Sequence, residues 1–279
     1  MDYATILVHL DASRRMHQRL HVAIRLAQEF QATLVGLLAI GQPDPRSLRY
    51  LVDGERYLAS YREWHNHAGE VARHGFLGAT DELLIPTEWR APEWATVDDI
   101  VVQGHTADLL VLGQHDPSDK DAFAEHHFVE SVVLQCGRPS WVVPYAGVVF
   151  PMGRNVLVAW NGSREAARAI HDALPFLQRA QAIDVVSWSQ PDASPSQWLS
   201  PPRYANEWLA RHRVEARLHD ITAASRDETG QMLLSMAADQ GSDLIVMGAY
   251  GHGRMRELVL GGVTRTILES MTVPVLLSH

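Results

Sequence analysis

The amino-acid sequence predicts an α/β protein with one doubly wound parallel-sheet domain in each half of the chain. Two observations lead to this fold class. Short apolar runs alternate with longer amphipathic runs, as in repeated strand-helix-strand units with right-handed crossovers. Runs such as Leu109–Leu112 and Leu244–Met247 lack polar alternation, as expected of strands that are covered on both faces of a parallel sheet.

The second half of the sequence repeats the first. The run from Thr5 to Ser13 (TILVHLDAS) matches the run from Asn155 to Ser163 (NVLVAWNGS). Further along, DLLVLG at 108–113 matches DLIVMG at 243–248, and the segment around Pro139 matches the segment around Pro274. The last two matches share one offset of 135 residues. Three matches in the same order indicate a duplication.

The pattern of apolar residues predicts each element in turn. In the first half we expect strands at about 4–10, 32–39, 81–86, 108–113 and 140–144, with helices at about 14–30, 54–74, 93–104 and 127–136. In the second half we expect strands at about 154–160, 182–188, 214–219, 243–248 and 274–278, with helices at about 163–179, 202–212, 226–240 and 261–270. The Pro- and Gly-containing stretch 144–153 is the expected linker, which gives domains at 1–146 and 152–279.

Composition excludes several classes of protein. The 279 residues are 46% apolar and 20% charged, which is typical of globular domains. No apolar run is long enough to span a membrane and no leader precedes the first strand, so we expect a protein without membrane contact. The single cysteine, Cys136, favours a reducing cytoplasm. A net charge of −9 argues against nucleic acid as a partner. The only lysine, Lys120, follows no Gly-rich loop, which argues against P-loop NTPases and protein kinases.

A glycine-rich loop after the fourth strand of the second half is the most specific local signal. Its glycines stand at 248, 251, 253, 261 and 262, and it also contains Arg254 and Arg256. Glycines let the backbone amides approach bulky anions, and the start of the following helix adds a favourable dipole. This pattern favours phosphate binding, while the alternative is a simple strand-to-helix turn. It is not a dinucleotide fingerprint, because the loop does not follow the first strand and lacks the third glycine.

The spacing Gly248-x2-Gly251-x9-Gly261, followed by a short helix and a terminal strand, is similar to the nucleotide-binding signature of the universal stress protein family. The likeness extends over both halves of the chain. It implies a tandem protein of two such domains, each an α/β, adenine-nucleotide alpha-hydrolase-like fold with a five-stranded parallel sheet of order 3-2-1-4-5. It also implies a ligand: ATP, or AMP or ADP, with or without Mg²⁺.

The resemblance places the adenine-nucleotide site in the second half. The implied nucleotide-binding residues are Asn161, Trp188, Met247, Gly248, Gly251, Gly253, Gly261, Gly262, Val263 and Thr264. Two positions depart from the family pattern, since Asn161 stands where ATP-binding members have Asp and Gly262 stands where Ser or Thr is usual. In the first half Asp116, His126 and His127 align with Gly251, Gly261 and Gly262, and these side chains would repel phosphate or block its approach.

Two functions from different classes follow. The first is a regulatory or stress-response protein that binds ATP in its second half, with no catalytic or metal-binding residues assigned and at most slow ATP hydrolysis. The second is a structural or interaction module without nucleotide that acts through dimerisation. In either case the last strands of the halves are expected to pair as an internal pseudo-dimer, with a homodimer as a further possibility. An adenylate-forming enzyme is disfavoured, because its phosphate motifs are missing from the sequence.

Other residues receive simpler interpretations. His115, Asp116, His126 and His127 are the one group numerous enough for a zinc site, and solvated faces or caps are the preferred reading. Ser13 and Ser163 are expected to be helix N-caps rather than nucleophiles. Trp160 and Trp188 end strands of the second half, where burial is preferred over stacking on a base. We expect Cys136 to be buried.

Overall fold

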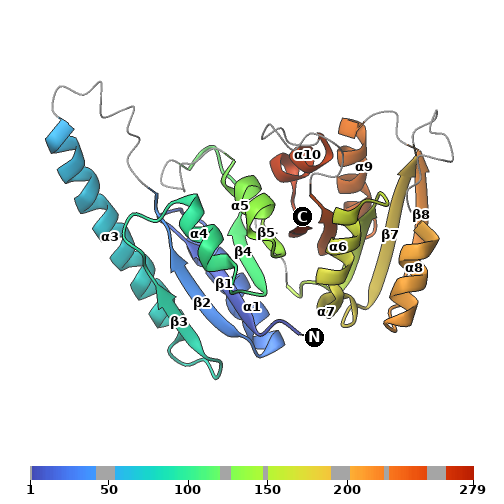
Figure 1. Ribbon diagram of the computed structural model, residues 1–279, viewed down its shortest axis with the longest axis horizontal. Coiled ribbons are helices and arrows are strands. Elements are labelled where there is room, and N and C mark those ends of the chain that lie inside the picture. The colour runs from blue at the N-terminus through green and yellow to red at the C-terminus, as the bar shows by residue number, and fades with distance from the viewer. Residues whose placement is uncertain are drawn as a thin grey trace. The chain divides into compact units, whose positions relative to one another are not determined.

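The computed structural model describes residues 2–41, 54–119, 127–146, 150–189, 202–222, 226–249 and 262–279. The chain forms two compact units (Figure 1). One contains residues 3–136, and we call it the first unit; the second unit contains residues 137–279 together with residues 1–2. Strands alternate with helices in both, and nearly all strand pairs are parallel, so the predicted α/β fold class is confirmed.

The first unit is built on four parallel strands in the order β3-β2-β1-β4. The chain moves outward from β1 to β3 and then returns to the other side of β1, so the strand order reverses between β1 and β4. Its elements are β1 (Thr5–Leu10), α1 (Met16–Phe30), β2 (Thr33–Leu38), α3 (Gly54–Thr80), β3 (Thr87–Arg90), α4 (Val97–Gly104), β4 (Leu109–Gly113) and α5 (Phe128–Cys136).

The second unit repeats this order in β8-β7-β6-β9, continues with β10, and has one further strand added beyond β10. The added strand, β5, is the last strand of the sequence's first half, and it pairs antiparallel with β10, Trp141 opposite Leu276. Strand order reverses here between β6 and β9. The elements are β5 (Ser140–Val143), β6 (Asn155–Trp160), α6 (Arg164–Asp172), α7 (Leu174–Leu177), β7 (Ala182–Ser189), α8 (Pro202–Arg211), β8 (Arg217–Thr222), α9 (Arg226–Asp239), β9 (Leu244–Gly248), α10 (Gly262–Ser270) and β10 (Val275–Ser278).

The central strands of each unit form its core. Leu109 to Leu112 in β4 and Leu244 to Met247 in β9 are all buried, as the continuous apolar runs predict. An aspartate before each of these strands has the same structural role in both units. The carboxylate of Asp108 accepts hydrogen bonds from the backbone of Ala4 and Thr5, and that of Asp243 accepts them from Arg154 and Asn155. The matched sequences therefore build matched local structure.

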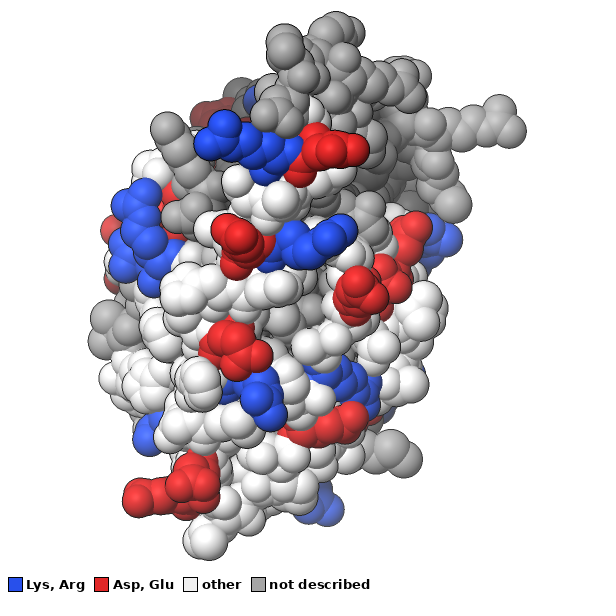
Figure 2. Space-filling view, turned by 90° about the vertical axis from the view of Figure 1, so that its left-hand side faces the viewer, with Lys and Arg blue, Asp and Glu red and all other residues white. Residues whose placement is uncertain are grey.

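Helix α3 is long and is attached to the first unit mainly by its last third. Of its 27 residues, Ala72, Phe76 and Thr80 are buried. The Phe76 ring lies directly on Gly36 of β2, where a Cβ atom would be 2.6 Å from the ring. Figure 2 looks at the side on which α3 lies in Figure 1, and it shows acidic and basic side chains interspersed over the described residues of that face. The described residues of that face therefore gather no basic patch of the kind that tracks nucleic-acid phosphates.

The third strand of each unit, β3 or β8, begins later in the sequence than expected. Residues 81–86 were expected to form a strand, but the strand is β3, from Thr87, and Leu84 is fully exposed. Pro86 explains the shift, since it has no N–H to donate and its carbonyl instead accepts from Leu34 at the start of the ladder. In the second unit β8 begins at Arg217 rather than near 214. The expected helix 163–179 is two helices, α6 and α7, with Pro175 in the first turn of α7.

Among the residues that the structure describes, no helix combines the length and apolar character needed to cross a membrane.

Candidate functional site

The predicted site residues that the structure describes lie at the carboxyl ends of neighbouring strands in the second unit. Trp160 of β6 pairs with Ser187 of β7, and Ala159 pairs with Met247 of β9. Asn161, Trp188 and Gly248 therefore follow at the same edge of the sheet. In open parallel sheets ligands bind beyond this edge, at the place where the strand order reverses. Gly251, Gly253 and Gly261 lie outside the described residues.

Gly248 allows helix α6 to approach the end of β9. A Cβ atom at this position would lie 2.4 Å from the carbonyl carbon of Glu165 and 2.5 Å from the backbone nitrogen of Ala166. Backbone atoms cannot move aside as a flexible side chain would, so only glycine fits there. Gly248 thus has a packing role that the motif alone did not reveal.

The N-terminus of α6 is occupied by groups of the chain itself. The Ser163 hydroxyl accepts a hydrogen bond from Ala166, which confirms Ser163 as the predicted N-cap. The Asn161 side-chain oxygen accepts from the Ser163 backbone at 3.1 Å. Burial opposes ionisation of Glu165, but hydrogen bonds from Arg164, its own backbone and Ser163 hold its pKa below the usual value. A carboxylate therefore already lies where this helix would attract an anion.

Helix α10 differs from α6 in this respect. It begins at Gly262, directly after the glycine loop, and has no acidic residue in its first turn. Gly262 and Val263 are half-buried, and Thr264 is 3% exposed. The first backbone N–H groups of a helix have no partner within it, and they carry the positive end of its dipole. The start of α10 is therefore a described helix N-terminus at this edge that suits a phosphate.

Aromatic and apolar side chains flank this edge. Trp160 is 5% exposed and Met247 is 3% exposed, so both belong to the core, as expected for Trp160. Trp188, at the end of β7, is only half-buried. Its indole ring is thus an aromatic surface at this edge that a ligand could reach.

The corresponding place in the first unit is filled by Arg19 of α1. Its side chain is 4% exposed, and it donates from Nη2 to Asp11 at 2.6 Å and from Nε to the carbonyl of His9 at 2.5 Å. Its guanidinium lies against Gly113, the counterpart of Gly248, where a Cβ atom would be 2.4 Å from Nη1. At the offset of the matched first strands, Ala169 replaces Arg19 in the second unit, and it is fully buried.

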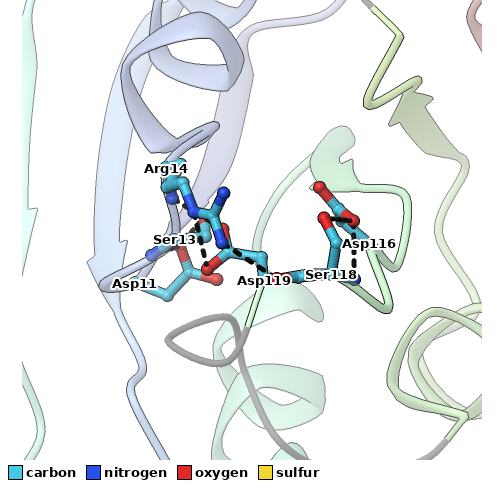
Figure 3. A network of polar contacts seen from close by, with 6 residues as sticks. All are labelled: Asp11, Ser13, Arg14, Asp116, Ser118 and Asp119. Atoms are coloured by element: carbon cyan, nitrogen blue, oxygen red, sulfur yellow. Dashed lines mark hydrogen bonds and ion pairs between the residues drawn. The ribbon is translucent and has the colours of Figure 1, made fainter.

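A second set of contacts ties the loop after β4 to the loop after β1 (Figure 3). The Asp119 carboxylate accepts from the Arg14 backbone at 2.8 Å, and the Arg14 side chain donates to the Ser118 carbonyl at 2.8 Å. Asp116 accepts from both the backbone and the hydroxyl of Ser118. Asp116 therefore forms a local turn where the second half has Gly251.

Buried charges in the first unit are compensated internally. Burial by itself would raise the pKa of Asp11, but Arg19, His9 and the Ser13 hydroxyl lower it to about 2. Burial lowers the pKa of His9 to about 4, and its Nε2 contacts the Ala39 carbonyl at 2.9 Å. The Asp11 carboxylate is thus compensated by groups of the same unit.

The structure corrects the expectation that Ser13 is a helix N-cap, and it does not test the group of histidines considered for zinc. Ser13 is not an N-cap: its hydroxyl donates to Asp11 at 2.5 Å, and α1 begins later, after Arg15, which makes no side-chain cap. Within the described ranges no three His, Cys, Asp or Glu side chains come together in a way that suits a metal ion, and His126 lies outside those ranges. Cys136 is buried, as expected.

Arg19 is the important residue that sequence reasoning missed. Its signal was present, because this arginine stands on the apolar stripe of α1 between the buried Met16 and Ala23. A charge on the buried stripe of a helix requires an internal partner. The preceding strand end, with Asp11, supplies that partner.

Known proteins resemble this chain in sequence and in fold. Universal stress protein Slr1230 of Synechocystis is 24% identical over 173 residues, which cover 61% of this chain and 57% of that protein. Universal stress protein MJ0577 of Methanocaldococcus jannaschii is 36% identical over 44 residues, 16% of this chain and 27% of that protein. The matched segments thus span less than two thirds of both relatives.

A solved structure extends the likeness to the whole chain. A universal stress protein from Archaeoglobus fulgidus superposes with a TM-score of 0.70 at 17% identity, covering 99% of this chain and 98% of its own. At that identity the likeness establishes the fold of both halves. The sequence of residues 152–279 matches the model of the universal stress protein family, and this part of the chain is a domain of that family.

Proposed function

We propose that the second unit binds an adenine nucleotide, ATP or its di- or monophosphate, and that the chain is a regulatory or stress-response protein. The phosphates would lie against the start of α10 and the glycine loop that precedes it. The base would lie near Ser187 and Trp188, with Asn161 close to the ribose. The family domain in residues 152–279 and the arrangement of the described strand ends support this proposal.

The contrast between Arg19 and Ala169 carries the proposal. In the first unit a guanidinium fills the space beside the motif glycine and neutralises the local carboxylate. In the second unit alanine stands at the equivalent place, and Asn161 brings no charge. The oxygen of Asn161 is engaged by Ser163, so its amide N–H groups are what it offers to a ligand. A polyanion meets the buried pair of Arg19 and Asp11 in the first unit, and Ala169 with the uncharged Asn161 at the equivalent positions of the second unit.

Magnesium and hydrolysis have less support from the chain's own residues. The Glu165 carboxylate is already bonded to Arg164 and Ser163, so the phosphates and water are expected to supply most Mg²⁺ ligands. We propose at most slow hydrolysis, because the Glu165 carboxylate at the start of α6 is already hydrogen-bonded to Arg164 and Ser163. The proposed compartment is a reducing cytoplasm, because the single cysteine cannot form an internal disulfide.

The pairing of β5 with β10 favours a second candidate, a scaffold that acts through its strand contacts. Trp141 of β5 is fully buried and its ring lies 4.8 Å from that of Phe176. This pairing is the internal counterpart of a dimer contact, and it does not depend on nucleotide. A protein that kept only this role would fold and associate normally without binding ATP.

Calorimetric titration with ATP, with and without Mg²⁺, tests nucleotide binding. We expect one site per chain in the wild type. Gly251→Asp, which places in the second unit the residue type that stands at 116 in the first, should weaken binding by about tenfold or more through repulsion of the phosphates.

Gly78→Asp is the matched control. Gly78 lies on α3 of the first unit, and a Cβ atom added there would meet no atom within 4 Å. This variant adds the same charge and should bind ATP like the wild type. Equal ATP affinity of the wild type and Gly251→Asp would move the site elsewhere, and absence of binding by a folded wild type would leave the scaffold as the function.

A further inference from the structure

Three residues stand side by side across the carboxyl ends of β6, β7 and β8. Trp160 pairs with Ser187, and Ser187 pairs with Asp220, so the three side chains share one face of the sheet. Trp160 and Ser187 are buried, whereas Asp220 is exposed. The row thus ends in a carboxylate that solvent, or a ligand at this edge, can reach; Figure 1 shows β7 and β8 running together to that edge.

The carboxylate of Asp220 is only loosely engaged. The Ser187 hydroxyl lies 3.4 Å from its Oδ1 and also 3.4 Å from the carbonyl oxygen of His219. Both distances are long for a hydroxyl donor, whose hydrogen bonds are typically about 2.7–2.8 Å. Asp220 therefore keeps most of its capacity to accept hydrogen bonds.

A second aspartate in the same strand pair, Asp184, has a carboxylate that is fully engaged by neighbouring side chains. Asp184 of β7 is 3% exposed, and it accepts from Arg217 at 2.7 Å and from His219 at 2.6 Å. Within the described part of the chain, Asp220 makes no such ion pair. The contacts within the strand pair explain why Asp184 stands where it does. They give the exposed carboxylate of Asp220 no comparable structural role.

We propose that Asp220 reads the exocyclic amine of the bound base and makes the site selective for 6-aminopurines over 6-oxopurines. This inference rests on the proposed function, which places the base beside Ser187, the direct neighbour of Asp220. A carboxylate accepts hydrogen bonds and donates none, so it favours the amine of adenine and repels the carbonyl oxygen of hypoxanthine or guanine. Asp220 is thus a specificity-determining residue.

Calorimetric titration with ATP and with inosine triphosphate, which has an oxygen in place of the amine, measures this selectivity. The wild type should prefer ATP. In Asp220→Asn the side chain keeps its shape but can both accept and donate, so it can serve either base. We expect ATP affinity to fall by about threefold to tenfold, inosine triphosphate affinity to stay or rise, and the ratio of the two to fall by at least threefold.

Asp239→Asn is the control, because Asp239 is an exposed aspartate at the end of α9, before β9, and so lies toward the opposite edge of the sheet. It should leave the ratio unchanged. An ATP-binding wild type whose preference survives Asp220→Asn within twofold, or that shows no preference at all, overturns the role of Asp220 and leaves the proposed function standing. A folded wild type that binds neither nucleotide refutes the proposed function itself.

Discussion

Arg19 introduces a full positive charge into the interior of the first unit, and its environment explains why the charge is tolerated there. Asp11 lies 2.6 Å away, and the His9 carbonyl accepts a second hydrogen bond. Removing two charges from water is costly, so a buried pair of this kind contributes little net stability compared with apolar residues. Its consequence is geometric: the Arg19 guanidinium fills the space beside Gly113.

His9, behind this pair, makes the first unit sensitive to acid. Burial lowers its folded-state pKa from 6.5 to about 4, so the unfolded chain binds more protons between those values. The contribution of neutral His9 to the free energy of unfolding is therefore present above pH 6.5, and it is lost as the pH falls toward 4. Between pH 7 and pH 5 the loss due to His9 should be about 2 kcal/mol.

Urea unfolding at pH 7 and pH 5 measures this loss. His9→Gln keeps an amide N–H that can reach the Ala39 carbonyl but does not titrate, so its stability should change by about 2 kcal/mol less than that of the wild type over this interval. Because every other histidine is common to both proteins, the difference isolates His9. Parallel pH profiles would show that His9 is not the acid-sensitive group.

At the scale of elements, local patterns predicted existence and order well and failed where a single residue decides a boundary. The buried runs of β1, β4, β6 and β9 identified those strands, because a strand covered on both faces leaves an unmistakable apolar run. The apolar residues around Leu84 were also expected to form a strand, but they precede Pro86, and the strand begins only at Thr87. The length of α3, which continues to Thr80, was underestimated because most of its surface is exposed and so lacks a strong apolar stripe.

Close packing of α10 against α9 depends on a glycine. A Cβ atom at Gly230 of α9 would lie 2.7 Å from the Cβ of Thr266 in α10. Gly230→Ala would gain about 1 kcal/mol of helix propensity, but forcing two helices apart in a packed interior costs about 1–3 kcal/mol. We expect the clash to prevail and the variant to be less stable than the wild type.

Gly78→Ala on α3 supplies the opposite case, since nothing lies within 4 Å of its added Cβ. Here only propensity acts, and stability should rise by about 0.5–1 kcal/mol. Thermal unfolding of both variants followed by circular dichroism compares them directly. If Gly230→Ala stabilised the protein as Gly78→Ala does, the contact between α9 and α10 would be looser than described.

The candidate site depends on the whole molecule more than on any single motif. Asn161, Trp188 and Gly248 are far apart in sequence, and the order of the strands brings them to one edge. Family resemblance predicted that gathering because topology is shared across such folds. The family resemblance did not predict the buried position of Arg19 beside Asp11, nor the position of Asp220 beside Ser187. Both positions depend on which side chains meet across elements.

The second unit also contains a strand from the first half of the sequence. Strand β5 belongs to that half but lies within the compact second unit. A fragment of residues 152–279 matches the family domain but lacks β5, so the backbone of Val275, Leu276 and Leu277 loses its antiparallel partner. It also loses the Trp141 ring, which is buried against Phe176. An unpaired apolar edge strand promotes association, and loss of a buried tryptophan typically costs about 3–5 kcal/mol.

A fragment of residues 137–279 retains β5, whose four residues stand between Pro139 and Pro144. In this fragment Val275, Leu276 and Leu277 therefore keep their antiparallel partner. We therefore expect this fragment to be monomeric and the 152–279 fragment to dimerise or aggregate, with its unfolding free energy lower by about 3 kcal/mol or more. Light scattering after size-exclusion chromatography and urea unfolding give both quantities, and Trp141→Ala in the longer fragment separates the loss of packing from the loss of pairing. Two monomeric fragments of equal stability would mean that β5 is dispensable to the second unit.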